Sequence, residues 1–308
     1  MVKNILVTAR SKMKMHRANS GQNRLGNASS IKQRPDGRVY ISGQMQRHAF
    51  FEALKAIDDS DDTYVSNGDA TSYQIEKDLR ADLGGFMLSE TLSGEQARRT
   101  APLSATPAVA EDKSSTVRDL LLRLQTDGST DNNIATQELS QDDVMNWSMN
   151  LNLRKLSTSE RYHFDAAEEE DRGMHVQTER VRHCSSEEKK RRAKLFLKAV
   201  SKLTEHASQA RNMTTAEPFE VLVVLDTTIS RKAGQYFDRS PAKQKAILAE
   251  LDDRNAQHFY GSDVDEEEDF VFEAFSDAKD ALDEADIYDN ADQQMTYAET
   301  YDSVPDLE

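Results

Sequence analysis

The chain has 308 residues and a formal net charge of −16, and 37% of its residues are hydrophobic. This length allows one large domain or two ordinary ones with a sizeable buried core, so we expect a globular protein. No apolar run is long enough to span a membrane, and residues 1–14 do not resemble a signal peptide, which predicts a cytoplasmic protein without a membrane partner. The single cysteine, Cys184, excludes an internal disulfide and a structural site built on several cysteines.

The charge is unevenly divided along the chain. Residues 251–308 contain 20 acidic and 2 basic side chains, which leaves 35 acidic and 37 basic side chains in residues 1–250. Residues 1–48 contain ten basic side chains and a single acidic one, that of Asp36. A basic segment of this kind favours a polyanionic partner, and a solvated basic face is the alternative.

The N-terminal third predicts a strand, a basic loop, a second strand and a helix. The apolar run at residues 4–9 is typical of a buried strand. Pro-Asp-Gly at residues 35–37 predicts a turn into the next strand. Ser42 then stands where a helix N-cap belongs, and Phe50 and Leu54 are spaced to face a core.

The middle of the chain predicts an insertion followed by regular structure. Residues 81–115 are rich in glycine, proline and small side chains, which indicates an insertion that projects from the core. Residues 116–125 predict a short helix. Residues 145–154 alternate strictly between apolar and polar side chains, which predicts a strand with one buried face. Its polar face is rich in amides and suits either hydrogen bonding to a partner or exposure to solvent.

Two further segments complete an α+β pattern. Residues 185–207 open with Ser185 and Glu188 at capping-box spacing and continue as an amphipathic helix. Its basic first turns fit a helix N-terminus poorly unless an anion lies nearby. The apolar run at residues 219–226 predicts a central strand buried on both faces. The order of strands and helices fits an α+β sandwich of ferredoxin or RRM type with insertions.

The acidic end of the chain predicts docked helices. We divide the chain at residue 250 into an α+β body, residues 1–250, and an acidic, helical C-terminal extension, residues 251–308. The extension carries large apolar side chains at a spacing that suggests helices packed on the body: Phe270, Phe272, Phe275, Leu282 and Ile287.

No catalytic or cofactor-binding motif is present. The sequence has no nucleotide-binding glycine loop, nucleophile elbow or HExxH zinc motif, so we expect neither an enzyme nor a cofactor. His163, His175, His183 and Cys184 lack zinc-site spacing, and we expect no metal site. Residues 263–269 lack the glycine and terminal glutamate of an EF-hand, which favours a solvated acidic loop.

The basic N-terminal segment predicts a phosphate-binding site. Arg47 and His48 lie in the first turns of a helix, where free N–H groups already favour an anion. The preceding strand and loop bring Arg38 and Lys32 or Arg34 close by. Such a site would hold nucleic acid through its phosphates without reading bases, and its affinity would fall steeply with salt.

Three segments, in order, resemble one protein family. Residues 23–54 contain Asn23-Arg24, a basic strand, an "ISGQ" helix start and a following Arg47. Residues 135–153 run from Thr-Gln-Glu into an asparagine-rich strand, and residues 207–214 read "ASQARNMT". Together they resemble the CRISPR-associated backbone subunits of Cascade-type complexes, the DevR-like "Cas seven" branch of the RAMP superfamily.

The resemblance implies an RRM-like palm with an inserted thumb that polymerises head to tail along a CRISPR RNA (crRNA). The thumb candidate is residues 81–115. The implied partners are the crRNA, target DNA or RNA paired through the guide, other copies of the chain in a helical filament and other Cascade subunits. The implied subunit is not catalytic. The candidate RNA-binding residues are Arg24, Lys32, Arg34, Arg38, Arg47, His48, Arg98, Arg99 and Arg211.

Two other functions remain open at this point. Backbone subunits of type III complexes cut target RNA with a loop aspartate, a role for which Asp36 is the candidate, although Pro-Asp-Gly favours a turn role for this residue. A free-standing RNA-binding regulator is the third possibility. The acidic extension could compete with RNA for the basic segment or repel incorrect neighbours.

Overall fold

The structure is a computed structural model that describes most of the chain. The described residues are 1–16, 20–22, 29–68, 72–87, 98–113, 117–123, 134–165, 174–204, 206 and 213–300. The strands defined in this part are β1 Asn4–His16, β2 Ser20–Gln22, β3 Ser29–Ile31, β4 Tyr40–Ile41, β5 Phe86–Met87, β6 Arg98–Arg99, β7 Leu103–Ala105, β8 Ala108–Ala110, β9 Val117–Arg123, β10 Ile134–Asn152, β11 Thr158–Asp165, β12 Met174–Arg182, β13 Pro218–Asp226, β14 Gln257–Ser262 and β15 Gln293–Gln294. The helices are α1 Gly43–Ile57, α2 Leu79–Gly84, α3 Ser186–Val200, the 3-10 helix η1 Lys232–Asp238, α4 Pro241–Asp253, α5 Val271–Glu284 and α6 Tyr297–Thr300.

An antiparallel sheet forms the centre of the fold. Its strands run in the order β14-β13-β1-β10-β8-β4, and β7 and β9 also pair with β10. β1 lies between β10 and β13, where Val7 is opposite Met149 on one side and Val223 on the other. The central strand predicted at residues 219–226 is confirmed as β13. β1 has 13 residues and extends well beyond the predicted residues 4–9.

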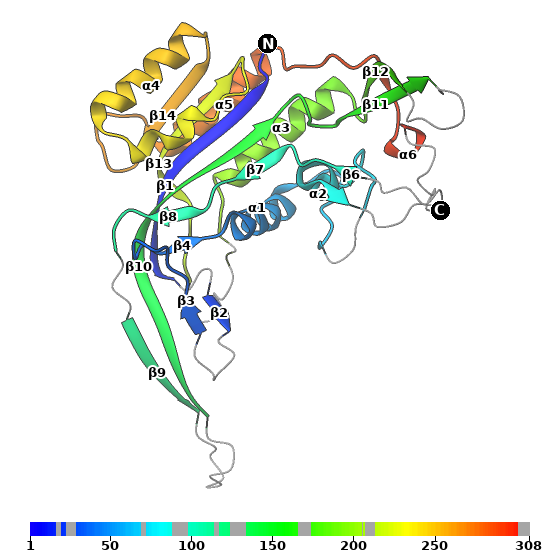
Figure 1. The fold of residues 1–308 in the computed structure, drawn as a ribbon. Coiled ribbons are helices and arrows are strands. Elements are labelled where there is room, and N and C mark those ends of the chain that lie inside the picture. Colours follow the sequence, from blue (N-terminus) through cyan, green and yellow to red (C-terminus); the bar gives the residue numbers. More distant parts are fainter. Residues whose placement is uncertain are drawn as a thin grey trace.

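Three helices, α1, α3 and α5, pack together over one face of this sheet (Figure 1). The Ser42 side chain caps α1 by accepting a hydrogen bond from the Met45 N–H, as the sequence predicts. α1 buries Phe50 and Leu54, and the Phe50 ring lies 5.7 Å from that of Phe196 in α3. The predicted alternation in β10 is confirmed, and its apolar side faces the same core through Met145, Trp147, Met149 and Leu151.

Other helices cover the opposite face at β13. Leu6 of β1 and Leu222 and Val224 of β13 pack there against Ile247 and Leu251 of α4, and η1 joins the same cluster. The alternate side chains of β13 are therefore buried on both faces, which explains why its sequence is a nearly continuous apolar run.

An arm formed by β9 and the first half of β10 projects from the body (Figure 1). The two strands pair from Val117 opposite Ser140 to Arg123 opposite Ile134. The helix predicted at residues 116–125 is therefore wrong. Pairing with β10 along the whole of β9 overrides the helix propensity of its leucines.

Part of the predicted insertion belongs to the sheet. β7 pairs with β10 at Leu103 opposite Leu151, and β8 pairs with both β10 and β4. Leu103 and Ala108 are buried. The prediction that residues 81–115 project is wrong for residues 103–110, because the apolar side chains among the small residues pack into the core.

The acidic C-terminal part is built into the same core. The boundary that we placed at residue 250 falls inside α4, and β14 pairs with β13 along its whole length. α5 buries Phe275 against the sheet, as its helical spacing predicts. Phe270 and Phe272 are instead 63% and 75% exposed, because Val271 occupies the inward position in the first turn.

None of the helices in the described part of the chain combines the length and the apolar character needed to cross a membrane.

Candidate nucleic-acid interface

The turn before β4 carries three of the predicted RNA contacts, Lys32, Arg34 and Arg38. The Gly37 N–H donates to the Arg34 carbonyl at 2.9 Å, and the φ of +84° at Gly37 favours glycine there. The Asp36 carboxylate accepts a hydrogen bond from Arg38 Nε at 3.0 Å and lies 3.7 Å from Arg34. Lys32 and Arg34 are exposed and Arg38 is half-buried, so the turn brings three cations together at the surface.

The surroundings of Asp36 give it a structural role in this turn. Its pKa is held below the ordinary value, first by a hydrogen bond from the Arg38 backbone N–H and then by the side chains of Arg38 and Arg34. The carboxylate thereby positions both guanidinium groups. These contacts agree with the turn role favoured from the Pro-Asp-Gly sequence.

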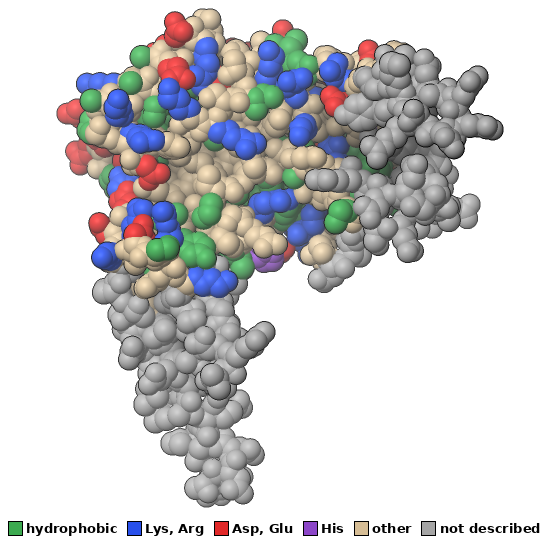
Figure 2. Space-filling view, in the orientation of Figure 1, with side chains coloured by type: hydrophobic (Ala, Val, Ile, Leu, Met, Phe, Trp, Pro, Cys, Tyr) green, Lys and Arg blue, Asp and Glu red, His purple; other side chains and the backbone are tan. Residues whose placement is uncertain are grey.

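A groove of about 610 Å³ lies beside the turn. Arg34 and Arg38 line it together with Arg239, which follows η1, and with polar residues of β1 and β10 such as Thr8 and Asn146. Figure 2 shows Lys and Arg side chains spread over the middle of the visible face of the body. A groove lined by three arginines from two separate segments suits a chain of phosphates.

The polar side of β10 is covered by η1 along part of its length. Ser148 Oγ donates a hydrogen bond to the Gly234 carbonyl at 2.8 Å, and Thr8 Oγ1 donates to the same carbonyl at 3.3 Å. Asn146 Nδ2 donates to Asp238 at 3.0 Å, whereas Asn146 Oδ1 is buried and has no hydrogen-bond partner. The polar face of β10, which we predicted to meet either a partner or solvent, is thus partly packed against η1 of the same chain.

Arg47 occupies a second basic position, in the first turns of α1. Its Nη2 donates to the Gly84 carbonyl at 2.6 Å, while its Nε is buried without a hydrogen-bond partner. Its pKa is lowered from the ordinary arginine value by burial and by the nearby charge of Arg80. No carboxylate in the described part of the chain pairs with Arg47. His48, the next residue, is exposed.

Arg99 has a different environment from these residues. Its Nη2 lies 2.5 Å from the buried carboxylate of Asp82, and the guanidinium also donates to the Thr158, Lys155 and Asp82 carbonyls and to Ser159 Oγ. Its side chain is only 5% exposed. The other partners of Asp82 are Arg192 and Ser157, so Arg99 belongs to a buried ionic cluster inside the body.

The remaining candidates are only partly covered by the structure. Arg98 lies in β6 opposite Met87, and its side chain is outside the description. Arg24 and Arg211 lie outside the described residues. The structure therefore brings Lys32, Arg34 and Arg38 together, and it places Arg47 and Arg99 in separate surroundings.

Comparison with known proteins identifies the family. Residues 7–233 match the family model "CRISPR-associated negative auto-regulator DevR/Csa2". The chain belongs to the DevR/Csa2 family. This confirms the resemblance drawn from residues 23–54, 135–153 and 207–214. No curated protein matches the chain significantly.

Two solved structures share the fold of this DevR/Csa2 chain. One, a chain of a "CRISPR RNA-guided surveillance complex", is 14% identical, with a TM-score of 0.52 over 93% of this chain and 95% of that one. The other, from a "CRISPR RNA-guided surveillance complex, pre-nicking", is 13% identical, with a TM-score of 0.50 over 93% of this chain and 96% of that one. The likeness extends over nearly the full length of the chains compared.

Two basic residues near the surface of the DevR/Csa2 chain, Arg80 and Arg239, were not predicted from sequence. Arg80 lies near Arg47, and its guanidinium stacks on the Phe51 ring at 4.6 Å. Arg239 faces Arg34 and Arg38 in the groove. These residues come from segments far apart in the sequence, and no local pattern marks them. Only the fold brings them together.

The histidines considered as metal ligands are engaged elsewhere or fall outside the description. His183 is buried between Ser159 and the Met295 carbonyl, and burial followed by the charge of Arg99 lowers its pKa to about 4. Burial raises the pKa of Cys184. The side chains of His163 and His175 are not described. Within the described residues, no three His, Cys, Asp or Glu side chains are placed to hold a metal ion.

Proposed function

We propose that this chain is a non-catalytic, crRNA-binding backbone subunit of a CRISPR interference complex. In this role it polymerises along the guide RNA and presents the guide for base pairing with target DNA or RNA. The observation that carries the proposal is the family match over residues 7–233. The similar folds in two RNA-guided surveillance complexes support it.

The order of elements supports an RRM-like palm. The chain runs β1, α1, β7 with β8, β10, α3 and β13, which is the β-α-β-β-α-β order of ferredoxin-like motifs. The four strands lie in the order β13-β1-β10-β8, with α1 and α3 packed over one face. The arm of β9 and β10 projects from this palm and replaces residues 81–115 as our candidate for the thumb (Figure 1).

The charges on the palm support binding to the RNA backbone. Lys32, Arg34 and Arg38 share one turn, and Asp36 holds two of them in place. Arg47 is a partly buried cation without a carboxylate partner among the described residues, which is an arrangement that an RNA phosphate would complete. These residues would fix the guide in position without reading its sequence.

RNA binding by arginine variants tests this proposal. The purified chain and its Arg34→Ala/Arg38→Ala and Arg47→Ala variants are titrated with a short guide RNA at several salt concentrations, with fluorescence anisotropy as the readout. Removal of one arginine–phosphate interaction should lower the slope of log K against log[salt] by about 0.7 for single-stranded RNA. Lys198→Ala, at an exposed lysine of α3, is the matched control and should leave the slope unchanged.

Co-expression provides the second test. Produced together with its partner subunits and a CRISPR array, the chain should co-purify with short RNA of uniform length. An RNA-free monomer under these conditions would contradict the proposal.

One specific observation favours a second candidate function. The name of the matching family contains the words "negative auto-regulator", which fits a free-standing RNA-binding regulator. A footprint of the isolated chain on one promoter or messenger would support this function. Binding to RNA of any sequence with equal affinity would favour the backbone subunit.

A further inference from the structure

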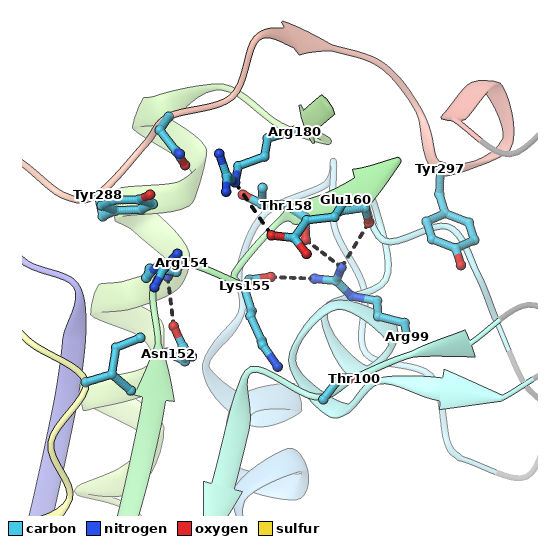
Figure 3. Close-up of a pocket in the computed structure, with 13 residues that line it drawn as sticks. Arg99, Thr100, Asn152, Arg154, Lys155, Thr158, Glu160, Arg180, Tyr288 and Tyr297 are labelled. Carbon is cyan, nitrogen blue, oxygen red and sulfur yellow. Dashed lines mark hydrogen bonds and ion pairs between the residues drawn. The ribbon is translucent and has the colours of Figure 1, made fainter. Parts of the chain in front are cut away.

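A basic pocket of about 420 Å³ lies beside Asn152, the last residue of β10 (Figure 3). It is lined from β6, from the residues after β10, from β11 and β12, from the loop after β13 and from the C-terminal segment. Its volume falls in the range of ligand sites. The residues that define its charge are Arg99, Arg154, Lys155, Arg180 and Glu160.

The cations of the basic pocket outnumber the carboxylates that pair with them. Arg99 is paired with Asp82, and Arg180 lies 3.5 Å from Glu160. Arg154 is exposed and stacks on the Tyr288 ring at 5.3 Å, and Lys155 is also exposed. No described carboxylate pairs with Arg154 or Lys155. The basic pocket therefore holds two uncompensated positive charges at its opening.

A buried lysine lies behind the lining of the basic pocket. Lys189 is buried behind Thr158, and its Nζ contacts only neutral oxygens, those of Thr158 at 3.3 Å and of the Tyr288 carbonyl at 2.9 Å. Burial and the charge of Arg99 lower the pKa of the neighbouring His183, and the Asp82 carboxylate opposes this shift in part. The charges of Arg154 and Lys155 at the opening of the basic pocket, unpaired among the described residues, favour an anionic occupant.

The acidic loop, residues 263–270, is a candidate occupant. All its residues are exposed, and six of the eight are acidic. Its apolar side chains are exposed too: Val264 is 68% and Phe270 63% exposed, and Phe272 just beyond it is 75% exposed. Exposed apolar side chains beside acidic ones suit contact with a protein surface that is both basic and apolar, and the acidic charge disfavours contact with nucleic acid.

The acidic loop is held in one shape. The Ser262 N–H donates to the Asp269 carbonyl at 2.7 Å, and Ser262 Oγ accepts from the backbone N–H of Val264 and of Asp265. The Val271 N–H donates to the Asp263 carboxylate at 3.1 Å. A loop fixed in this way loses little conformational entropy when it docks.

The acidic loop and the basic pocket lie at opposite ends of β13. The Asp263 N–H bonds to the Phe219 carbonyl, beside the first residue of the strand. The basic pocket lies at the other end of β13, because its lining includes Ile229, three residues after the strand ends. The lining also includes Asn152, which pairs with Asn4 of β1, and Asn4 in turn pairs with Asp226, the last residue of β13. Nine residues of strand span about 26 Å at about 3.3 Å per residue, so one copy cannot bring the two together.

We propose that the acidic loop of one copy docks into the basic pocket of a second copy. The contact joins different surfaces of the two copies, so it repeats head to tail along the direction of β13. Glu266, Glu267 and Glu268 approach Arg154 and Lys155, while Phe270 and Phe272 pack beside the exposed Ile229. This proposal deepens the proposed function, on which it rests, because it names the protein contact between successive copies on the guide.

Charge reversal and restoration test the contact. The full chain is examined by sedimentation velocity at low and moderate salt, alone and bound to guide RNA. Glu266→Lys/Glu267→Lys/Glu268→Lys and Arg154→Glu/Lys155→Glu should each weaken self-association about tenfold or more, because each places like charges against one another. A chain carrying all five substitutions should associate again. Asp277→Lys/Asp280→Lys/Glu284→Lys, on exposed positions of α5, carries the same change in charge and should associate as the wild type does.

A disulfide trap tests the geometry independently of charge and with milder substitutions. Glu267→Cys chains mixed with Lys155→Cys chains should form a disulfide-linked pair under mild oxidation, since the native Cys184 is buried. Mixing Asp280→Cys with Lys155→Cys is the control and should give no such pair.

Three results would overturn the contact: a wild-type chain that stays monomeric with and without RNA, a five-substitution chain that does not regain association, or no disulfide pair. Binding of a short RNA is measured on the same samples. If the wild-type chain does not bind RNA, or binds it and stays monomeric, the proposed function fails. If the wild-type chain binds RNA and self-associates and only the variant or disulfide results are negative, the contact alone fails.

Discussion

Replacing Asp82 by asparagine should strongly destabilise the body. The Asp82 carboxylate is fully buried and contacts Arg99 at 2.5 Å, Arg192 at 2.7 Å and Ser157 Oγ at 2.6 Å. Burial opposes its ionisation, but the two arginines and the Ser157 hydrogen bond outweigh that effect and lower its pKa. Asp82→Asn leaves two buried guanidinium groups around a neutral amide. Breaking a buried ion pair from one side costs about 3–5 kcal/mol.

Urea unfolding followed by circular dichroism measures this destabilisation. A change of 1 kcal/mol shifts Tm by about 2–4 °C in domains of 150–250 residues and by somewhat less in larger ones, so the variant should unfold several degrees below the wild type. The double variant Asp82→Asn/Arg99→Met should lose less free energy of unfolding than the sum of the losses in the two single variants. The Arg99→Met change removes a guanidinium group that Asp82→Asn alone leaves buried and unpaired. Lys202→Ala removes an exposed ion pair with Glu217 and is the control, with an expected change within about 1 kcal/mol. A decrease below about 1 kcal/mol for Asp82→Asn would refute the reasoning.

Three further predictions follow from particular residues. Asp36→Ala should leave cleavage of target RNA in Mg²⁺ at the wild-type background level, since Asp36 serves the turn; a metal-dependent cleavage that this change abolishes would favour the endonuclease. Gly85→Ala should cost about 1–3 kcal/mol in urea unfolding, because φ is +66° and a Cβ would lie 2.5 Å from the Arg99 carbonyl oxygen. His183 and His206 have pKa values of about 4 against the ordinary 6.5, so their contribution to stability is complete above pH 6.5 and is lost as the pH falls toward 4. Urea midpoints measured across this range should fall with pH, and His206→Gln should reduce the fall.

Local sequence patterns predict the elements whose environment is uniform along their length. β10 alternates because one of its faces packs on the core over many residues, and β13 is apolar throughout because both its faces are covered. Ser185 caps α3, as its spacing to Glu188 predicts. The Glu188 carboxylate, however, pairs with Arg191 and Arg192 of the same helix. Arg191 also pairs with Asp58, and Arg192 pairs with Asp82. These carboxylates are the nearby anions that the basic first turns of α3 require.

The elements and sites that the sequence does not predict depend on pairing between distant segments. The leucines of β9 fit a helix as well as a strand, and only the partner strand decides between them. Arg98 and Arg99 are adjacent arginines that the sequence does not distinguish. In the structure the Arg99 side chain is buried because it pairs with the buried carboxylate of Asp82. The basic pocket combines side chains from residues 99 to 297, and no single segment of the sequence indicates it.

The structure narrows the role of the acidic C-terminal part. A mobile acidic tail could compete with RNA for the basic segment, but β14 is a strand of the central sheet and α5 is part of its core. Deleting residues 252–308 would remove both and unfold the body, so the absence of RNA binding after that deletion could not reveal competition. Charge reversal of the acidic loop avoids this problem, because its side chains are exposed. If the loop competed with RNA, Glu266→Lys/Glu267→Lys/Glu268→Lys would raise the affinity of single copies for a short RNA more than the Asp277→Lys/Asp280→Lys/Glu284→Lys control, which carries the same change in net charge. If the loop docks on a neighbouring copy, the two variants bind the short RNA equally, and only the loop variant weakens the association between copies.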